Sequence, residues 1–211
     1  MKASFAALVA AALLGGTTCV LAASNVDLTV KGIITPSACT PTLSQGGLID
    51  HGKVSAKELS ENTYTNLPDA KLQLGVNCES PVLYVVRGID NREGTSWGGP
   101  WGFGLGLIND GTQKLGYYLF FFGNAVGDGE RVSALYSPDG IRWLDNEDPY
   151  MWSREGFAGF GHQTAGIWAP IPIKQLTTDI RVNTAIAPTN GLTLTSEQPI
   201  DGSSTLEIVY R

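Results

Sequence analysis

The side chains that could support catalysis are few in this sequence. It contains two histidines, His51 and His162, and three cysteines. Asp50 stands beside His51, but adjacent residues of a strand point to opposite faces, so the two are not expected to form a catalytic dyad. No serine is predicted to be a nucleophile. We therefore expect no enzymatic activity, and a stand-alone periplasmic enzyme would require a site at His162 or in the acidic loop described next.

Asp145, Glu147 and Asp148 form the densest acidic cluster in the sequence. Carboxylates so close together could act as paired acids or supply oxygen ligands to calcium. Their spacing lacks the regular ligand positions of a calcium-binding loop. A solvated acidic turn is the preferred interpretation, and the sequence predicts neither a metal site nor a cofactor.

Aromatic residues are concentrated in the middle of the chain, in or beside stretches that read as long loops. They are Trp97, Trp101, Trp143, Tyr150, Trp152, Phe157, Phe160 and Trp168. Flat rings on a secreted β-protein can stack on sugars, and Trp97, Trp101 and Trp152 are the candidates for such a ligand platform. The alternative, which the usual burial of tryptophan favours, is that these rings anchor loops or fill the core.

Short strands are the elements that must position these side chains. Apolar and polar residues alternate with the period of a strand in many segments, and no segment has a convincing amphipathic helical pattern. The dipeptides Asp110-Gly111 and Asp139-Gly140 predict hairpin turns. A further turn is expected at 124–130 and a helical turn at 56–61. The expected strands are 48–54, 71–77, 82–87, 103–108, 115–122, 131–136, 141–144, 167–173, 175–187 and 204–210.

The composition agrees with an all-β exported protein. The chain of 211 residues has 26 glycines, 11 prolines and 16% charged residues, as expected where turns are frequent. The favoured fold is an antiparallel β-sandwich. The formal net charge is −6 and no run of lysine or arginine occurs, so we do not expect nucleic acid as a partner.

Residues 1–23 read as a secretory signal peptide: Lys2 gives a positive start, an apolar stretch follows, and small residues precede position 24. Cys19 lies within it and lacks a good lipidation motif. Cys39 and Cys78 then remain as an even pair in an exported chain, which predicts a disulfide. Two free buried thiols are the alternative.

The stretch 24–39 stands out because a strand pattern opens the chain after the signal. Its apolar face is formed by Val26, Leu28, Val30, Gly32 and Ile34. The final stretch alternates in the same way, with Leu206, Ile208 and Tyr210 on one face. By itself the first pattern could be an ordinary first strand of the chain's own sheet.

Together these features resemble the pilin subunits of the bacterial chaperone–usher pathway, and the Trp-rich middle is similar to a group of fimbrial-like proteins of proteobacteria. The motifs that carry the resemblance are Val30-Lys31-Gly32-Ile33-Ile34, Ala38-Cys39, Ile49-Asp50-His51-Gly52-Lys53-Val54, Leu72-Gln73-Leu74-Gly75-Val76-Asn77-Cys78 and Tyr210. From 88 to 200 the resemblance is weak. Pilins also often carry a glycine about a dozen residues before the end, whereas Gly202 lies nearer to it.

The resemblance implies an immunoglobulin-like sandwich, 37–211, that lacks its last strand. The stretch 24–36 would be a donor strand for a neighbouring subunit, with Val26, Leu28, Val30 and Ile34 filling pockets and Gly32 sitting where the groove leaves no room. The implied partners are a periplasmic pilus chaperone, which would pair with Leu206, Ile208 and Tyr210, the outer-membrane usher and other pilin subunits. The expected protein is a structural subunit of a surface fimbria, exported through the periplasm; the alternative is a secreted carbohydrate-binding adhesin that uses the Trp-rich loops.

Overall fold

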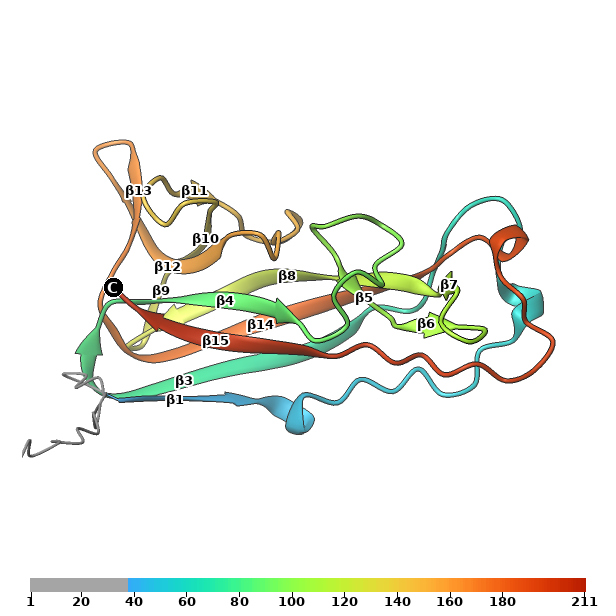
Figure 1. Ribbon diagram of the computed structural model, residues 1–211. Helices are drawn as coiled ribbons and strands as arrows, with labels where there is room; N and C mark the ends of the chain where they lie inside the picture. Colours follow the sequence, from blue (N-terminus) through green and yellow to red (C-terminus); the bar gives the residue numbers. More distant parts are fainter. Residues whose placement is uncertain (1–37) are drawn as a thin grey trace, which may run out of the picture. The chain divides into compact units, whose positions relative to one another are not determined.

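The structure, a computed structural model, describes residues 38–211, which fold into two antiparallel sheets packed as the layers of a sandwich (Figure 1). The expected signal peptide 1–23 and donor strand 24–36 lie outside the described residues. The all-β sandwich predicted from the sequence is confirmed. Three short 3-10 turns accompany the strands: η1 Ser44–Gly47, η2 Ala56–Glu58 and η3 Thr189–Gly191.

The first sheet has its longest strands at its centre. In spatial order it consists of β1 Cys39–Leu43, β3 Ala70–Val82, β14 Ile173–Ile186, β8 Gly116–Gly127 and β5 Phe103–Gly104. Two short strands join it from the side, β2 Thr65–Asn66 against β14 and β9 Glu130–Arg131 against β8.

The second sheet ends in the last strand of the chain. Its spatial order is β11 Leu144–Asp145, β10 Ser133–Ser137, β12 Phe157–Thr164, β4 Tyr84–Asp90 and β15 Ser204–Tyr210, with β13 Ile167–Pro170 paired to β12. A separate hairpin of β6 Leu107–Ile108 and β7 Gln113–Lys114 turns at Asp110-Gly111, where both residues have positive φ. This hairpin was predicted from the same dipeptide.

The core lies between the sheets and follows from the alternation of the long strands. On β3, Leu72, Leu74 and Val76 are buried, whereas Lys71 and Gln73 are exposed. Strand β14 likewise turns every second side chain of its central part inward. Because a strand's side chains alternate, these two strands form one continuous apolar floor.

Trp152 is the centre of the aromatic part of this core. Its ring is fully buried, stacks on Phe120 at 6.3 Å between centroids, and meets Phe122 edge-on at 5.2 Å. The loop that carries Trp152 is bound to β8, because the backbone N–H of Trp152 donates to the carbonyl of Phe120 at 2.8 Å. Trp152 is therefore a core anchor, and its assignment to a ligand platform is wrong.

Several local predictions fail, among them the strand expected at 141–144, of which only Leu144 belongs to a strand, β11. Two failures have identifiable reasons. Residues 48–54 were expected to form a strand but do not. A strand must pair with a neighbouring strand, and within 38–211 no strand pairs with this segment. The turn expected at 124–130 begins later, because β8 continues to Gly127. The strand bulges at Asn124, which has a φ of 52°, opposite a register shift between Thr177 and Asp179 of β14.

Candidate functional site

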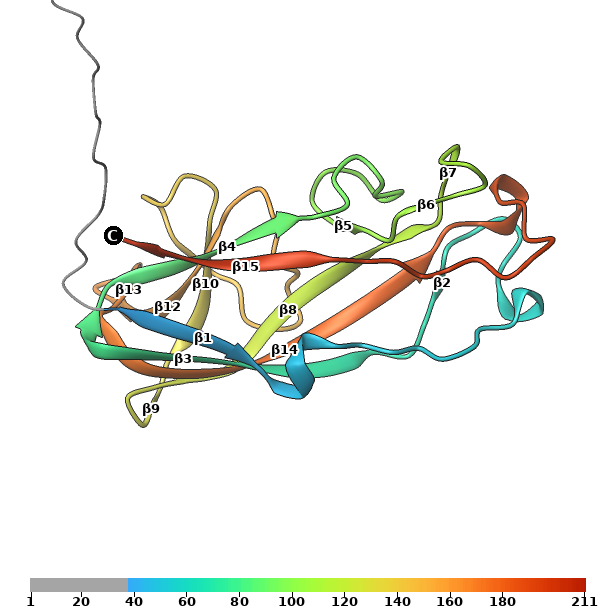
Figure 2. The same cartoon turned by 60° about the horizontal axis from the view of Figure 1, so that its bottom comes forward.

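An open side of the sandwich lies between β1 and β15. Within residues 38–211, β1 pairs only with β3 and β15 pairs only with β4, so each strand has one unpaired edge. Figure 2 shows β1 in blue and β15 in red at the borders of the two layers. The sequences leading away from these strands, 44–59 and 192–203, continue the two borders. We call the space between them the groove.

Apolar side chains on both borders are only half-buried, although they pack on the core. On the β1 border they are Cys39, Leu43, Ile49, Val54 and Leu59; on the β15 border they are Leu192, Leu194, Ile200, Leu206, Ile208 and Tyr210. Leu206, Ile208 and Tyr210 therefore share one face, as the alternation predicts. The groove exposes the margin of the hydrophobic core.

Two adjoining cavities give the groove its depth. The first, about 250 Å³, reaches core residues of the first sheet, including Leu72, Phe120 and Val182, and is bordered by Leu206 of the second sheet. The second, about 870 Å³, continues toward residues 194–200 and has a more polar rim. Both are lined by Ile49, His51 and Ile200, so the two cavities meet at these residues. The groove is a long channel with an apolar floor.

The backbone of β15 directs unused hydrogen-bonding groups toward the groove. Arg211 donates to the carbonyl of Leu83, and Asn91 to that of Ser203, so the odd-numbered residues exchange bonds with β4. In an antiparallel ladder the intervening residues point their N–H and C=O groups to the other edge. Those residues are Ser204, Leu206, Ile208 and Tyr210. The strand can thus accept a further strand beside it.

The β1 edge has the same alternation with one donor missing. Glu79 donates to the carbonyl of Ala38, which places the outward-directed backbone groups at Cys39, Pro41 and Leu43. Pro41 has no N–H, as is usual for proline in an edge strand. The β1 border therefore offers fewer backbone bonds than the β15 border.

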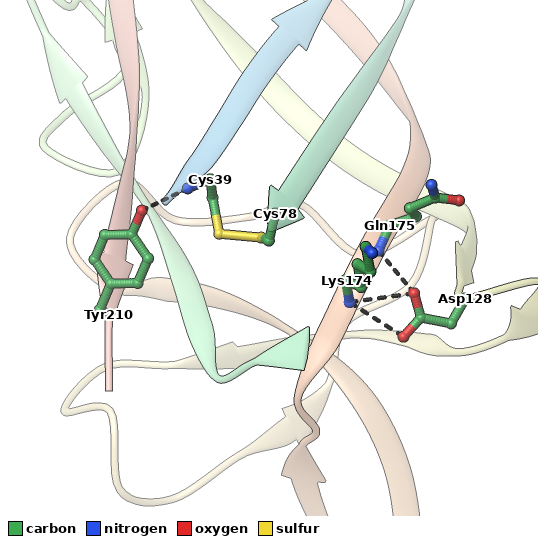
Figure 3. The surroundings of a disulfide bond; sticks show 6 residues. All are labelled: Cys39, Cys78, Asp128, Lys174, Gln175 and Tyr210. Carbon is green, nitrogen blue, oxygen red and sulfur yellow. Dashed lines mark hydrogen bonds between the residues drawn. A yellow bond between two sulfur atoms is a disulfide. The ribbon is translucent and has the colours of Figure 1, made fainter. Parts of the chain in front are cut away.

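A polar contact crosses the groove at each end. At the first, the Cys39 N–H donates to the Tyr210 hydroxyl at 2.8 Å (Figure 3). At the other, the Lys53 ammonium lies 2.8 Å from a Glu197 carboxylate oxygen. Both side chains of this ion pair are almost fully exposed, and exposed pairs contribute little stability. The second contact can thus be broken at small cost.

A disulfide fixes the β1 border beside the first contact. Cys39 and Cys78 lie directly opposite each other in the β1–β3 ladder and are bonded, which confirms the predicted pair (Figure 3). Near this end the Asp128 carboxylate accepts the N–H groups of Lys174 and Gln175, so the turn after β8 caps the start of β14. This end of the sandwich is held by covalent and polar links.

His51 brings a polar side chain into the groove. Its Nε2 lies 3.0 Å from the Thr184 hydroxyl, which is buried on β14. The Asp50 carboxylate instead accepts the Gly52 N–H at 2.8 Å. The adjacent acid and imidazole thus have separate partners, although this segment is not the strand from which the prediction was made. His162 lies exposed on β12.

The acidic loop forms ion pairs with the outer face of the first sheet. Arg181 binds Asp148 through two guanidinium nitrogens and stacks on the Phe121 ring at 3.8 Å, and Arg131 binds Glu147 at 2.7 Å. The hydrogen bond from Arg181 lowers the pKa of Asp148 below its usual value. These residues line a polar cavity of about 500 Å³. The preferred interpretation as an acidic turn is thus refined: the loop is ion-paired.

Of the two remaining platform candidates, Trp97 is 46% exposed and Trp101 is half-buried, edge-on to Tyr117. Tyr64, 50% exposed, contacts the same Tyr117 ring. Of the three platform candidates, Trp97 and Trp101 are thus at least partly exposed, whereas Trp152 is buried in the core.

Sequence reasoning overlooked one motif, Gly94-Thr95-Ser96-Trp97-Gly98, which has the spacing of a hydrolase nucleophile elbow. Such an elbow joins a strand to a helix and exposes the serine to a histidine. Here Ser96 follows β4 in a loop, is 6% exposed, and its hydroxyl has no hydrogen-bond partner within the described chain. The required context is missing, so the motif does not mark a nucleophile.

Within residues 38–211, no group of three or more histidine, cysteine or acidic side chains is placed to hold a metal ion, and no helix is long and apolar enough to cross a membrane. The predicted inward residues of the donor strand, Val26, Leu28, Val30, Gly32 and Ile34, lie outside the described part.

Comparisons with known proteins relate the chain to one family of unknown function and to two proteins of Escherichia coli. Residues 28–100 match the family described as "Protein of unknown function (DUF1120)". Protein GltF of Escherichia coli (strain K12) is 34% identical over 76 residues, which cover 34% of this chain but only 30% of GltF. Uncharacterized protein YhcF of the same strain is 23% identical over 220 residues, 90% of this chain and 92% of YhcF. The family match spans β1, β3 and β4 together with the β1 border of the groove.

Proposed function

We propose that this protein is a structural subunit of a cell-surface fimbria and is polymerised by donor-strand exchange. The observation that carries the proposal is the groove between β1 and β15, in which half-buried core residues and unpaired backbone edges lie together. The function requires no bond-making chemistry.

The groove has the properties that β-strand addition needs. Backbone groups of Ser204, Leu206, Ile208 and Tyr210 would bond to an added strand and supply affinity. The cavities along the groove would take every second side chain of that strand and fix its register. An added strand would therefore complete the sandwich.

The stretch 24–36 has the pattern of such a strand for a neighbouring subunit. Four aliphatic side chains, Val26, Leu28, Val30 and Ile34, would be buried, each contributing roughly 1.5–3 kcal/mol before the cost of ordering the strand. Gly32 interrupts the row. The joint between subunits would be strong although it contains no covalent link.

An open groove also explains why partners would be needed before assembly. Exposed core margins and free strand edges favour aggregation. A periplasmic chaperone would lend a strand to the Leu206, Ile208 and Tyr210 edge, and the outer-membrane usher would replace it with the next subunit's strand. The protein would thus pass through the periplasm to the cell surface.

A synthetic strand tests the proposal. The chain without residues 1–36 is mixed with a peptide of sequence 24–36, and its melting temperature and light scattering are measured. We expect a large rise in melting temperature and less aggregation. A scrambled peptide, and one with Gly32→Trp, should have neither effect. A truncated chain that is already stable and ignores the peptide would contradict the proposal.

A second candidate function, binding of carbohydrate, is favoured by the exposed ring of Trp97 and by Trp101 and Tyr64, which both contact the Tyr117 ring. It predicts glycan-array binding that is lost in Trp97→Ala, with Tyr150→Ala, an exposed aromatic on another loop, as the control. Binding unaffected by Trp97→Ala would exclude this surface.

A further inference from the structure

His51 places an imidazole in the groove, whose first cavity is lined mainly by apolar side chains together with Thr184, Ser203 and Ser204. It lies where the two cavities meet, between Ile49 and Ile200, and its ring is bonded to Thr184 on the floor. Most of the other side chains that line the first cavity are apolar: Leu43, Leu48, Leu72, Leu105, Tyr118, Phe120, Ile180, Val182 and Leu206; Ser203 and Ser204 add hydroxyls on the β15 side. A strand that filled the groove would cover this pair.

The pair has unused hydrogen-bonding capacity. An imidazole has two ring nitrogens, and Nε2 is engaged with Thr184. Nδ1 has no hydrogen-bond partner among residues 38–211 and is not fully buried. The His51 side chain lines both cavities, so a strand bound there would cover it. When a strand displaces water there, Nδ1 is left unpaired unless the strand supplies a partner, and an unpaired buried polar atom is costly.

We propose that His51 and Thr184 form a selectivity point, which favours an incoming strand with a hydroxyl or amide side chain (Ser, Thr or Asn) facing the imidazole. This inference rests on the proposed function, because it concerns which strand the groove accepts. A strand that is aliphatic at every inward position is disfavoured. Elsewhere along the apolar floor the preference is reversed, because a hydroxyl there would lose water and gain no partner.

The selectivity point determines which kind of partner strand binds more tightly. The chain's own candidate strand presents Val26, Leu28, Val30, Gly32 and Ile34 inward, and none of these carries a hydrogen-bonding side chain. A strand that does carry one at the selectivity point binds more tightly than the chain's own. The groove therefore prefers the strand of a different subunit that carries such a side chain to the strand of a second copy.

Peptides that exchange a methyl for a hydroxyl test this directly. The monomeric fraction of the full chain is titrated with fluorescent peptides of sequence 24–36. Each inward position is compared as a matched pair: threonine against valine at 26, 28, 30 and 34, and serine against alanine at 32. At one position we expect the hydroxyl peptide to bind about 5- to 10-fold more tightly, and at the others more weakly.

Protein variants assign the preference to the imidazole. In His51→Leu the hydroxyl preference should disappear while the aliphatic peptides still bind. His51→Gln, which keeps a hydrogen-bonding group, should retain part of it. His162→Leu, at the exposed second histidine, should change nothing. Circular dichroism of each variant establishes that it is folded.

The outcomes separate this inference from the proposed function. If peptides bind but the hydroxyl weakens binding at all five positions, or if the preference persists in His51→Leu, the selectivity point is refuted and the subunit function stands. If no peptide binds to folded protein, the donor-strand function fails and the selectivity point fails with it.

Discussion

The backbone N–H of Cys39 donates a hydrogen bond of 2.8 Å to the hydroxyl of Tyr210, across 171 positions of sequence. Cys39 belongs to the first sheet and Tyr210 to the second, so one side chain joins the two borders of the groove. The bond exists because Cys39, at the open edge of β1, has an N–H that no strand of the described chain accepts. Tyr210 thus defines where the groove ends.

Replacing Tyr210 by phenylalanine should lower the free energy of unfolding by about 0.5–1.5 kcal/mol, because the Cys39 N–H loses its partner. Urea titration followed by tryptophan fluorescence measures the change. Tyr84→Phe is the matched control, since Tyr84 faces Tyr210 in the β4–β15 ladder and its buried hydroxyl has no partner within the described chain. It should cause no loss of stability, and equal losses in both variants would contradict the assignment.

Reducing the disulfide should destabilise the fold by about 4 kcal/mol in the chain-entropy model, given a separation of 39 residues between Cys39 and Cys78. Thermal unfolding with and without a reductant measures this difference. In the double variant Cys39→Ala, Cys78→Ala the reductant should have no effect. A wild-type transition that is unchanged by complete reduction would show that the disulfide does not contribute.

The sequence predicted the parts of the fold that are encoded locally. Strand alternation located β15 and most of β14, and two Asp-Gly dipeptides located hairpins, because periodicity and turn chemistry act over a few residues. The disulfide was predictable from the count of cysteines. Residues 48–54 show the limit: their alternation is that of a strand, but within 38–211 no strand pairs with them.

The candidate site was only partly predictable, because it depends on contacts distant in sequence. The alternation of Leu206, Ile208 and Tyr210 indicated one border of the groove. The contact of His51 with Thr184, 133 positions away, has no local signal. For Trp152 the sequence left two possibilities, a ligand platform or the favoured core anchor, and the contact that decides between them is distant in sequence: the backbone N–H of Trp152 bonds to Phe120 of β8, and the ring lies in the core.

Gly88 should not tolerate a side chain, because β4 passes directly over the aromatic core. A Cβ at this position would lie 2.7 Å from the Trp152 ring and 2.8 Å from the Phe103 ring. Gly88→Ala should therefore lower the free energy of unfolding by about 1–3 kcal/mol. Gly191→Ala, where a Cβ meets nothing within 4 Å, is the control and should be close to neutral. Denaturant titration compares the two, and equal stabilities would contradict the packing.

The ion pair of Arg181 and Asp148 should make stability depend on pH in the acidic range. Arg181 lowers the pKa of Asp148 in the folded chain below the value of about 3.9 in an unfolded chain. The folded state then binds fewer protons, so the pair stabilises the fold above the unfolded-chain pKa and is lost as the pH falls through the folded-state value. Because both side chains are partly exposed, the contribution of the ion pair to the free energy of unfolding should stay below about 1 kcal/mol.

Melting temperatures measured between pH 2 and pH 6 should fall less steeply in Asp148→Asn than in the wild type. The control variant Asp110→Asn, at an exposed hairpin turn, should follow the wild type. Parallel curves for wild type and Asp148→Asn would mean that the pair holds the loop without contributing to folding stability.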